Sequence, residues 1–432
     1  MVQFGARGLH IVIFCRIFLN FGRVVADNSL WVLVFYKSIR VDDQRIKMGL
    51  KILVIGAGIA GPTVCYWLKR FGFSPVLIEK SAALRKGGQA LDLRGVVVEL
   101  AKKMGIYEHV CNRRTQVEIG RYVDTQGNIL HEEVGERFGH RQGDDVEILR
   151  ADLVSILMQA IADVPCYFSK TVKSIQQDAK GITVDFDQGN QERYALVIGA
   201  DGVHSATRNR VFDRQDYTFN NLGCYLSTFS IPNYLHLSHT EVICETEQKL
   251  ASLYNDQDPN IARAGFMFRS NHLLKNIRDQ QEQQQFLLET YRNFGWETPK
   301  ILELMQYSHD FYFDLIEQVK MPSWTKGRVA LLGDAAYCAS PLSGQGNNLA
   351  MVGAYILAGE LKKAQGDYVQ AFARYNQILR PWVEATQSFG AFVGASFLVF
   401  DKISEEKVKE RAETFTQQIE RLSTGFTLPE YE

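Results

Sequence analysis

A glycine-rich turn between a short apolar run and a helix is the feature that most constrains the fold of this chain. The sequence KILVIGAGIAGPTVCYWLKRFGFSPVLIEK starts with the apolar run Lys51–Ile55, passes through G-x-G-x-x-G and continues with helical spacing over Ala60–Phe71. A second β-rich run, Pro75–Ile78, is closed by Glu79. Strand, turn, helix and strand in this order predict a βαβ unit of an α/β protein with a Rossmann-type domain.

The three glycines of this turn have separate expected roles. Gly56 permits the tight turn, Gly58 lets a pyrophosphate approach the backbone, and Gly61 lets the helix pack closely on the strand. Glu79 follows about 20 residues after the turn, where a carboxylate can reach a ribose hydroxyl. A lone G-x-G-x-x-G is a weak signal, but in this context it predicts dinucleotide binding.

A second glycine-rich stretch, GRVALLGDAAYCASPLSGQGNN at Gly327–Asn348, narrows the choice of dinucleotide. A predicted strand, Arg328–Leu332, leads to Gly333-Asp334, and a P-x-x-G-x-G-N loop then opens a long helix. The Asp334 carboxylate can accept hydrogen bonds from a sugar-alcohol chain such as ribityl. The N–H groups at the start of the helix favour an anionic ligand, such as the N1/C2-oxygen edge of a reduced flavin. The stretch therefore predicts FAD.

A third stretch, LVIGADG, follows a region that is strand-like from Cys166 to Ile198. Turn signals at Lys180-Gly181 and around Gly189 predict a small antiparallel insertion there. Asp201 begins a D-G-x-x-S-x-x-R pattern that ends at Arg208. This spacing is hard to explain as a random turn, so we expect the stretch to reach the same cofactor.

Two further segments carry charge that could serve the same site. In GGQALDLR at Gly87–Arg94, two glycines allow close approach to a ligand, although an ordinary loop explains the local pattern equally well. Glu147–Leu153 is expected to start a helix that runs to about Ala162. Arg150 in its first turn can reach a phosphate or a flavin oxygen, or can be a solvated residue of the helix start.

Composition indicates a large enzyme that acts on a small molecule. A chain of 432 residues exceeds what one core usually holds, and 46% apolar residues can supply two. A net charge of −1 gives no reason to expect nucleic acid. The seven cysteines are odd in number and lack a C-x-x-C pair, which is typical of reduced thiols in a cytoplasmic protein. His236 with His239, and the run His131–Glu133, lack the further ligands of a zinc site, so no metal is predicted.

The first 47 residues do not fit the pattern that follows. Charged and polar residues interrupt their apolar stretches, so they contain no uninterrupted apolar span of about 20 residues. They also form a poor signal peptide, and no membrane association is expected. Met48 lies shortly before the first predicted strand. We hypothesise that Met48 is the working start and that residues 1–47 are an upstream extension outside the fold.

The three motifs together resemble those of the FAD-dependent aromatic hydroxylases, the p-hydroxybenzoate hydroxylase-like flavoprotein monooxygenases, from about Met48 to Arg380. Within them the chain is most similar to the tetracycline destructases, on the segments FGFSPVLIEKSAALRKGGQALDLRG, FMFRS, NFGWET and GDAAYCASPLSGQGNN.

The resemblance implies an extended FAD with its adenosine ribose on Glu79. It implies that Arg150 and Asp334 contact the flavin half and that Asp92 lies near the isoalloxazine. It also implies that NADPH binds transiently without a Rossmann domain of its own, which agrees with the single fingerprint. The predicted cofactor-binding residues are Gly56, Gly58, Ala60, Gly61, Glu79, Lys80, Asp92, Arg150, Asp201, Gly333, Asp334, Pro341, Gly344, Gly346 and Asn347.

The implied chemistry is monooxygenation. NADPH reduces FAD, a C4a-hydroperoxyflavin forms with O₂, and one oxygen atom is transferred to a polycyclic enol or phenol, with tetracycline antibiotics as the expected substrates. The flavin carries this chemistry, so we assign no catalytic residue. Alternatives are an aromatic or polyketide hydroxylase of the same fold and an FAD-binding reductase or oxidase without hydroxylation. A flavin halogenase is disfavoured because the chain lacks the W-x-W-x-I motif.

The substrate is expected to bind a second, sheet-rich domain formed by residues 108–132 and 215–320. Predicted strands at Asn221–Pro232, Glu241–Tyr254 and Ile261–Ser270 would roof the flavin. In RAGFMFR, strand alternation places Arg263 and Met267 on one face and two phenylalanines on the other. Arg263 and Met267 are therefore candidate substrate contacts, although packing or solvated surface explains them as well. Pro341 and Gly344 are further candidates, because the resemblance puts their loop beside the reactive flavin edge.

The FAD-binding domain is expected at 48–107, 133–214 and 321–354, with C-terminal helices in 355–432 that bridge the domains in a monomer. Helices are expected at Asn347–Lys363, Tyr368–Ser388 and Glu405–Leu422. The apolar segment Ser388–Phe400 is either a buried helix or a gate at the mouth of the substrate pocket, with Phe392 as the candidate gate residue.

Overall fold

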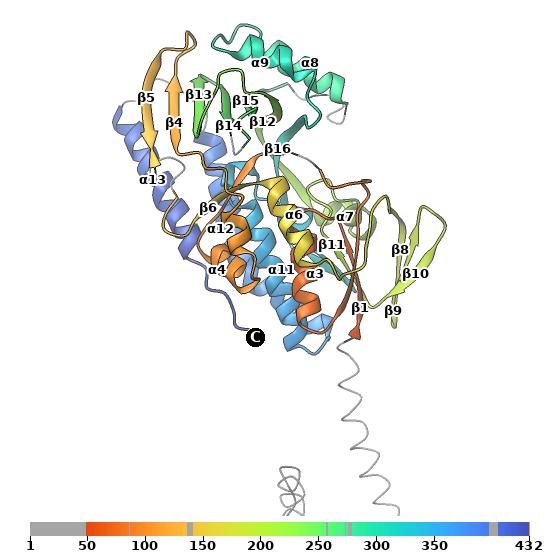
Figure 1. The fold of residues 1–432 in the computed structure, drawn as a ribbon. Coiled ribbons are helices and arrows are strands. Elements are labelled where there is room, and N and C mark those ends of the chain that lie inside the picture. The colour runs from red at the N-terminus through yellow and green to blue at the C-terminus, as the bar shows by residue number, and fades with distance from the viewer. Residues whose placement is uncertain are drawn as a thin grey trace, which may run out of the picture. The chain divides into compact units, whose positions relative to one another are not determined.

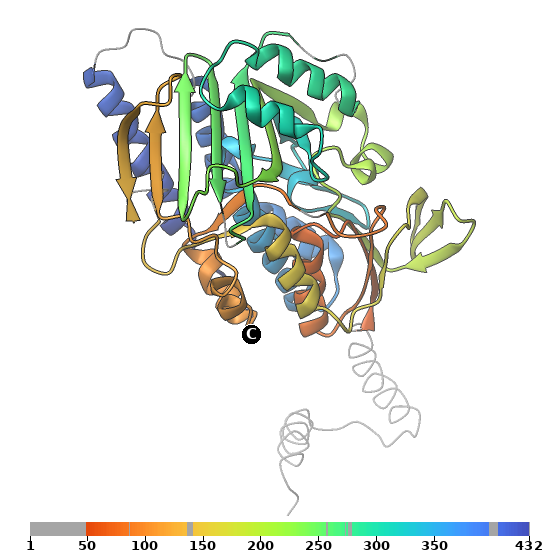
Figure 2. The ribbon, with the colours of Figure 1, turned by 45° about the horizontal axis from the view of Figure 1, so that its top comes forward.

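The computed structural model describes residues 49–85, 87–135, 141–255, 258–272, 274, 279–396 and 405–431 (Figures 1 and 2). Residues 1–47, for which we predicted an upstream extension, and residues 397–400 of the apolar segment lie outside the described residues. Met48–Glu432 forms one compact unit, so its division into cofactor- and substrate-binding domains stays a prediction.

A mostly parallel sheet carries the three glycine motifs. Across the described residues its order is β17-β18-β11-β1-β2-β7, and the central strand β1 (Lys51–Ile55) pairs in parallel with β2 (Ser74–Ile78) and β11 (Leu196–Gly199). Strand β18 (Val329–Leu331) pairs in parallel with β11. The motifs follow β1, β11 and β18, and carboxyl ends of parallel strands meet at one edge of a sheet. Residues separated by more than 270 positions are thereby brought to one place. The remaining strands are β7 (Cys166–Tyr167) and the antiparallel edge β17 (Thr325–Lys326).

The helices next to this sheet enclose the largest core. Helix α3 (Ala60–Arg70) follows the glycine turn and packs against α11 (Gly346–Lys363), whose residues from Asn347 to Leu361 are all buried. The rings of Trp67 and Tyr355 meet edge-on between these two helices, with centroids 4.7 Å apart. The described residues also form the helices α4 (Val96–Lys103), α5 (Tyr107–Cys111), α6 (Arg150–Ala160), α7 (Ala206–Val211), α10 (Asp334–Tyr337) and α13 (Glu405–Thr424).

Helix α12 (Tyr368–Ser396) also packs on α11 and corrects the predicted end at Ser388, because the helix continues into the apolar segment. A Cβ added to Gly390 would lie 2.5 Å from the Ala339 carbonyl oxygen, so this glycine serves close packing inside the helix rather than a break.

A seven-stranded sheet forms the second layer of the unit, with the order β16-β12-β15-β14-β13-β4-β5 among the described residues. Residues Phe266 and Phe268 of β15 point to one face, where the helices α8 (Gln280–Tyr291) and α9 (Thr298–Met305) cover a second core (Figure 2). Arg263 and Met267 alternate with them and are half-buried on the other face, as the strand pattern predicted. The strands are β12 (Thr218–Pro232), β13 (Thr240–Thr246), β14 (Lys249–Asn255), β15 (Ile261–Arg269), β16 (Tyr312–Lys320), β4 (Ile119–Val123) and β5 (Ile129–Val134).

Two predicted elements are wrong in detail. Glu241–Tyr254 is not one strand but the antiparallel hairpin β13–β14, which turns through Gln248 in a left-handed conformation (φ 64°). Glu147–Leu149 does not start a helix but lies in strand β6 (Val146–Leu149), which pairs with β3 (Ala90–Leu93). In the V-E-I-L run only Glu147 is not fully buried, and pairing with β3 supplies the backbone hydrogen bonds of the run, so the helix begins only at Arg150.

The predicted antiparallel insertion is confirmed. Its three strands in the described chain are β8 (Val172–Asp178), β9 (Gly181–Phe186) and β10 (Gln191–Tyr194), joined in the order β10-β9-β8.

Candidate active site

The glycine turn after β1 is built for close approach of the backbone. Gly56 has a φ of 108°, and a Cβ added there would lie 2.5 Å from the Ala200 carbonyl oxygen at the end of β11. A Cβ on Gly61 would lie 1.9 Å from the Gly56 carbonyl oxygen. Both positions therefore need glycine for the packing of turn, strand and helix. At Gly58 an added Cβ would face the Arg150 guanidinium at 3.5 Å inside the pocket.

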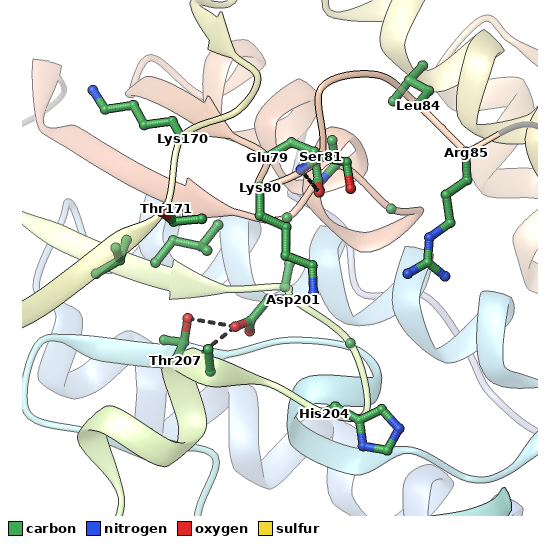
Figure 3. A pocket seen from close by; sticks show the side chains of 18 of the residues that line it. Glu79, Lys80, Ser81, Leu84, Arg85, Lys170, Thr171, Asp201, His204 and Thr207 are labelled. Carbon is green, nitrogen blue, oxygen red and sulfur yellow. Dashed lines mark hydrogen bonds between the residues drawn. The ribbon is translucent and has the colours of Figure 1, made fainter. Parts of the chain in front are cut away.

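Glu79 lines a first pocket, whose walls also include the glycine turn and the end of β11 (Figure 3). Its Oε2 accepts a hydrogen bond from the Ala57 N–H at 2.9 Å, and its Oε1 accepts one from the Ser81 N–H at 2.9 Å. The backbone thus fixes the carboxylate against the turn. Each oxygen keeps a second lone pair with which it can accept a hydrogen bond from a hydroxyl group.

Asp201 lies across this pocket, and its carboxylate organises the start of α7. Its Oδ1 accepts from the Ser205 hydroxyl at 2.5 Å. Its Oδ2 accepts from the N–H and hydroxyl of Thr207 at 2.9 and 3.0 Å (Figure 3). Arg208 is fully buried and donates to the carbonyls of Val203 at 2.6 Å and Ala335 at 2.9 Å. The D-G-x-x-S-x-x-R pattern after β11 is therefore joined to the segment that follows β18.

A second pocket adjoins the first and shares with it the residues Gly58, Arg150, Ala200 and Gly202. Together the two form a continuous trough along the carboxyl edge of the parallel sheet. Asp334 is exposed to the second pocket, but the protein groups that surround it raise the pKa of its carboxyl, opposed by the positive charge of Arg150. Burial and the neighbouring charge of Arg85 lower the pKa of the Arg150 guanidinium.

The first turn of α11 is tied to strand β3. The Asn347 side-chain amide donates a hydrogen bond of 2.8 Å to the Asp92 carbonyl oxygen. The Asp92 carboxylate in turn accepts from Arg94 at 2.7 Å and pairs with Arg141 at 3.5 Å. Arg141 also pairs with Glu147 at 3.0 Å. These contacts fix Asp92 and the first turn of α11 as two walls of the second pocket.

Comparison with known proteins decides the class of ligand. The model of the "FAD binding domain" family matches residues 49–385. A flavin-dependent monooxygenase of Legionella longbeachae is 62% identical over 383 residues, which cover 89% of this chain and 98% of that protein. The chain belongs to the FAD-binding-domain family of flavin-dependent monooxygenases.

Solved structures agree with this assignment of the monooxygenase. The crystal structure of tetracycline destructase Tet(51) is 59% identical, with a TM-score of 0.83, and covers 89% of this chain and 100% of that chain. Tetracycline destructase Tet(55) is 53% identical, with a TM-score of 0.83, and covers 89% and 99%. Klebsiella pneumoniae HpxO complexed with FAD and uric acid has a TM-score of 0.64 at 22% identity, over 87% of this chain and 94% of that chain, which shows a shared fold.

The residues of the monooxygenase trough fit FAD. Arg150 and Arg85 bring two positive charges to the first pocket, and in Figure 3 the Arg85 guanidinium points toward its centre. A pyrophosphate carries the complementary charge. Helix α11 begins at the second pocket, and in this described segment no side chain caps its N-terminus. Its N–H groups suit the anionic edge of a flavin.

The structure brings most of the predicted cofactor residues together. Residues Gly56, Gly58, Glu79, Lys80, Arg150 and Asp201 line the first pocket, and Gly58, Ala60, Asp92, Arg150, Asp334, Pro341, Gly344, Gly346 and Asn347 line the second. Gly61 and Gly333 line neither of the two, but shape their turns. Gly333 has a φ of 64° and an added Cβ would lie 3.2 Å from the Ala60 Cβ.

Three predicted substrate residues of the monooxygenase lie outside both pockets. Arg263 and Met267 lie on the inner face of the seven-stranded sheet, and Phe392 packs half-buried against the largest core. Sequence reasoning missed Arg85 and Arg141. The only available signal for Arg85 was a cation beside a double glycine after β2, whereas Arg141 had none.

Membrane-spanning helices and metal sites are both absent from the residues that the structure describes. No helix in them is both long and apolar enough to span a membrane. In the same residues, no group of three or more histidine, cysteine, aspartate or glutamate side chains is arranged to hold a metal ion.

Proposed function

We propose that this monooxygenase uses NADPH to oxygenate a polycyclic enol or phenol and that tetracycline antibiotics are among its substrates. The observation that carries the proposal is the likeness to Tet(51), at 59% identity over the full length of that structure. When bound, the flavin would supply the activation of O₂. The work of the chain is to hold this cofactor, orient the substrate and exclude water.

The trough suggests how the chain would hold FAD. The first pocket would take the adenosine and pyrophosphate, with Glu79 accepting from a ribose hydroxyl and Arg150 with Arg85 facing the phosphates. The second pocket would take the flavin half, with Asp334 accepting from the ribityl chain. The uncapped start of α11 would face the pyrimidine edge. Lys80, Asp201 and Asp92 would complete the walls.

The substrate would lie between the Pro341–Gly344 turn and the inner face of the seven-stranded sheet. Strand β3 connects the two regions, because Ala90 lines the second pocket and packs in one cluster with Tyr254 of β14. Arg263 is the neighbour of Tyr254 on β15. Arg263 and Met267 would contact the substrate, and Phe392 would limit its entry. On this basis, residues 108–132 and 215–320 form the substrate part, and 48–107, 133–214 and 321–354 form the FAD part, with 355–432 bridging them in a monomer.

The test is incubation of purified protein with FAD, NADPH and tetracycline while the drug absorbance and the product mass are followed. We expect NADPH-dependent loss of absorbance and a product heavier by one oxygen atom. Flavin reduction that another phenol or polyketide accelerates, with tetracycline unchanged, would support the hydroxylase alternative. NADPH oxidation that is indifferent to every substrate would identify a reductase or oxidase.

A further inference from the structure

A polar cluster at one end of the seven-stranded sheet surrounds Asp310, a residue that no motif marks. Its Oδ1 accepts hydrogen bonds from the Ser230 N–H and the Ser308 hydroxyl, both at 2.8 Å. Its Oδ2 accepts from the Ser230 hydroxyl at 2.6 Å and from the Arg263 guanidinium at 3.3 Å. The Asp310 carboxylate therefore ties together β12, β15 and the turn before β16.

The same cluster fixes the direction of Arg263. Its Nη1 donates to both the Ser230 hydroxyl, at 3.0 Å, and Asp310. Only 12% of each side chain of the Arg263–Asp310 pair is exposed. Burial alone would raise the pKa of Asp310, but hydrogen bonds from Ser230 and Ser308 and the charge of Arg263 outweigh it and hold that pKa below its ordinary value. The carboxylate is thus ionised and paired at neutral pH.

Cross-strand register places Arg263 beside the active site. Ser230, Arg263, Tyr254 and Glu241 form one row across β12, β15, β14 and β13. Tyr254 in this row packs in one cluster with Ala90, which lines the flavin-side pocket. A guanidinium in the same row can therefore face a ligand that lies between the sheet and that pocket.

Asp310 also touches the loop that walls the cofactor trough. A Cβ added to Gly87 would lie 2.1 Å from the Asp310 Oδ2. One residue later, a Cβ added to Gly88 would lie 3.5 Å from the Cβ of Arg150. The double glycine thus passes between the substrate-side carboxylate and the cofactor-side arginine.

We propose that Asp310 is a positioning residue, which holds the Arg263 guanidinium in the orientation that binds an anionic or enolic oxygen of the substrate. This inference rests on the proposed function, because it takes Arg263 as a substrate contact. Asp310 acts through Arg263 and touches no reacting atom. Its contact with Gly87 is steric, so the isosteric Asp310→Asn keeps that contact while it removes the charge.

A double-mutant cycle with tetracycline as substrate tests the coupling. Asp310→Asn should raise the KM roughly tenfold, the size expected when one partner of a buried charged hydrogen bond is removed. Arg263→Gln should raise it at least as much. The double variant should be no worse than Arg263→Gln alone, because Asp310 has nothing left to orient. Losses that multiply in the double variant would overturn the proposal. The FAD Kd of Asp310→Asn should stay within about twofold of wild type.

Two matched variants keep the test decisive if Asp310→Asn folds poorly. Ser308→Ala removes a hydrogen bond to the Oδ1 that does not face Arg263, and it should leave the KM unchanged. Ser230→Ala removes the hydroxyl that bridges Asp310 and Arg263, and it should raise the KM in the same direction as Asp310→Asn. The reverse ranking of these two serines would contradict the positioning role.

A readout without substrate separates this inference from the proposed function. Phenylglyoxal modifies accessible arginines, and peptide mapping gives its rate at each site. Asp310→Asn should speed modification of Arg263 several-fold and leave Arg269, on the same strand, unchanged. Equal rates at Arg263 in both proteins would show that Asp310 does not hold it. Faster modification of Arg263 in Asp310→Asn, together with a wild-type protein that does not oxidise tetracycline, would contradict the proposed substrate but not the positioning role of Asp310.

Discussion

The guanidinium of Arg208 donates a hydrogen bond of 2.9 Å to the carbonyl of Ala335, which lies 127 residues later in the chain. Arg208 closes the D-G-x-x-S-x-x-R pattern, and Ala335 lies in α10, directly after Gly333-Asp334. A single buried side chain therefore holds two walls of the trough in register. The Asp201 carboxylate of this pattern accepts its hydrogen bonds from Ser205 and Thr207 within the same motif. The contact made by Arg208 therefore gives the pattern a structural role between motifs.

Replacing Arg208 should destabilise the protein and loosen the trough together. Arg208→Met leaves the carbonyls of Val203 and Ala335 without their donor, and a buried hydrogen bond to a charged group is worth about 1.5–3 kcal/mol. We expect a loss of about 2–4 kcal/mol in the free energy of unfolding by urea. The exposed Arg292→Met is the matched control. Equal midpoints for the two variants would refute the bracing role.

Two glycines of the first turn should separate folding from cofactor binding. Gly61→Ala places a Cβ 1.9 Å from a backbone oxygen and should lower the Tm of the apoprotein. Gly58→Ala meets only ordinary contact at 3.5 Å, so the apoprotein should melt like wild type. Its Cβ points into the pocket and should weaken FAD binding at least roughly tenfold. Fluorescence titration with FAD measures this, and Gly49→Ala, with no atom within 4 Å, is the control.

Much of this site was predictable because its signals are local. A turn that requires Gly56 or Gly61 can be recognised from spacing alone, and so can the strands before each motif. The hairpin β13–β14 was missed because its turn at Glu247-Gln248 uses neither glycine nor proline, although Gln248 has a φ of 64°. Asp310 and Arg141 were missed because their partners come from other strands, and only the tertiary fold brings them together.

Glu241 should make stability depend on pH. Burial raises the pKa of its carboxyl to about 7, with repulsion from Glu147 adding and the charge of Arg141 opposing. Because the pKa of Glu241 is higher in the folded state than in the unfolded state, the folded state binds this proton more tightly. The stability of the folded protein is therefore highest below the unfolded pKa of Glu241, and it falls as the pH rises through the folded pKa of about 7. Glu241→Gln should therefore gain stability relative to wild type between pH 5 and 8, by up to about 3 kcal/mol. Parallel stability curves for the two proteins would contradict this.

Phe392 and Phe389 of α12 should respond differently to truncation. Phe389 is 2% exposed within the largest core, so Phe389→Ala should cost about 3–5 kcal/mol of stability. Phe392 is only half-buried, and if it gates the substrate then Phe392→Ala should change the substrate KM more than the stability. Lost stability with an unchanged KM in Phe392→Ala would favour the buried-helix interpretation of this segment.

We propose above that the trough carries FAD and directs one atom of O₂ into a tetracycline. The direct measurement is the product mass after turnover of tetracycline with NADPH under dioxygen enriched in the heavy isotope. We expect one labelled oxygen atom in the product, and none when NADPH is left out. Consumption of NADPH with unlabelled, unchanged tetracycline and labelled hydrogen peroxide would contradict it.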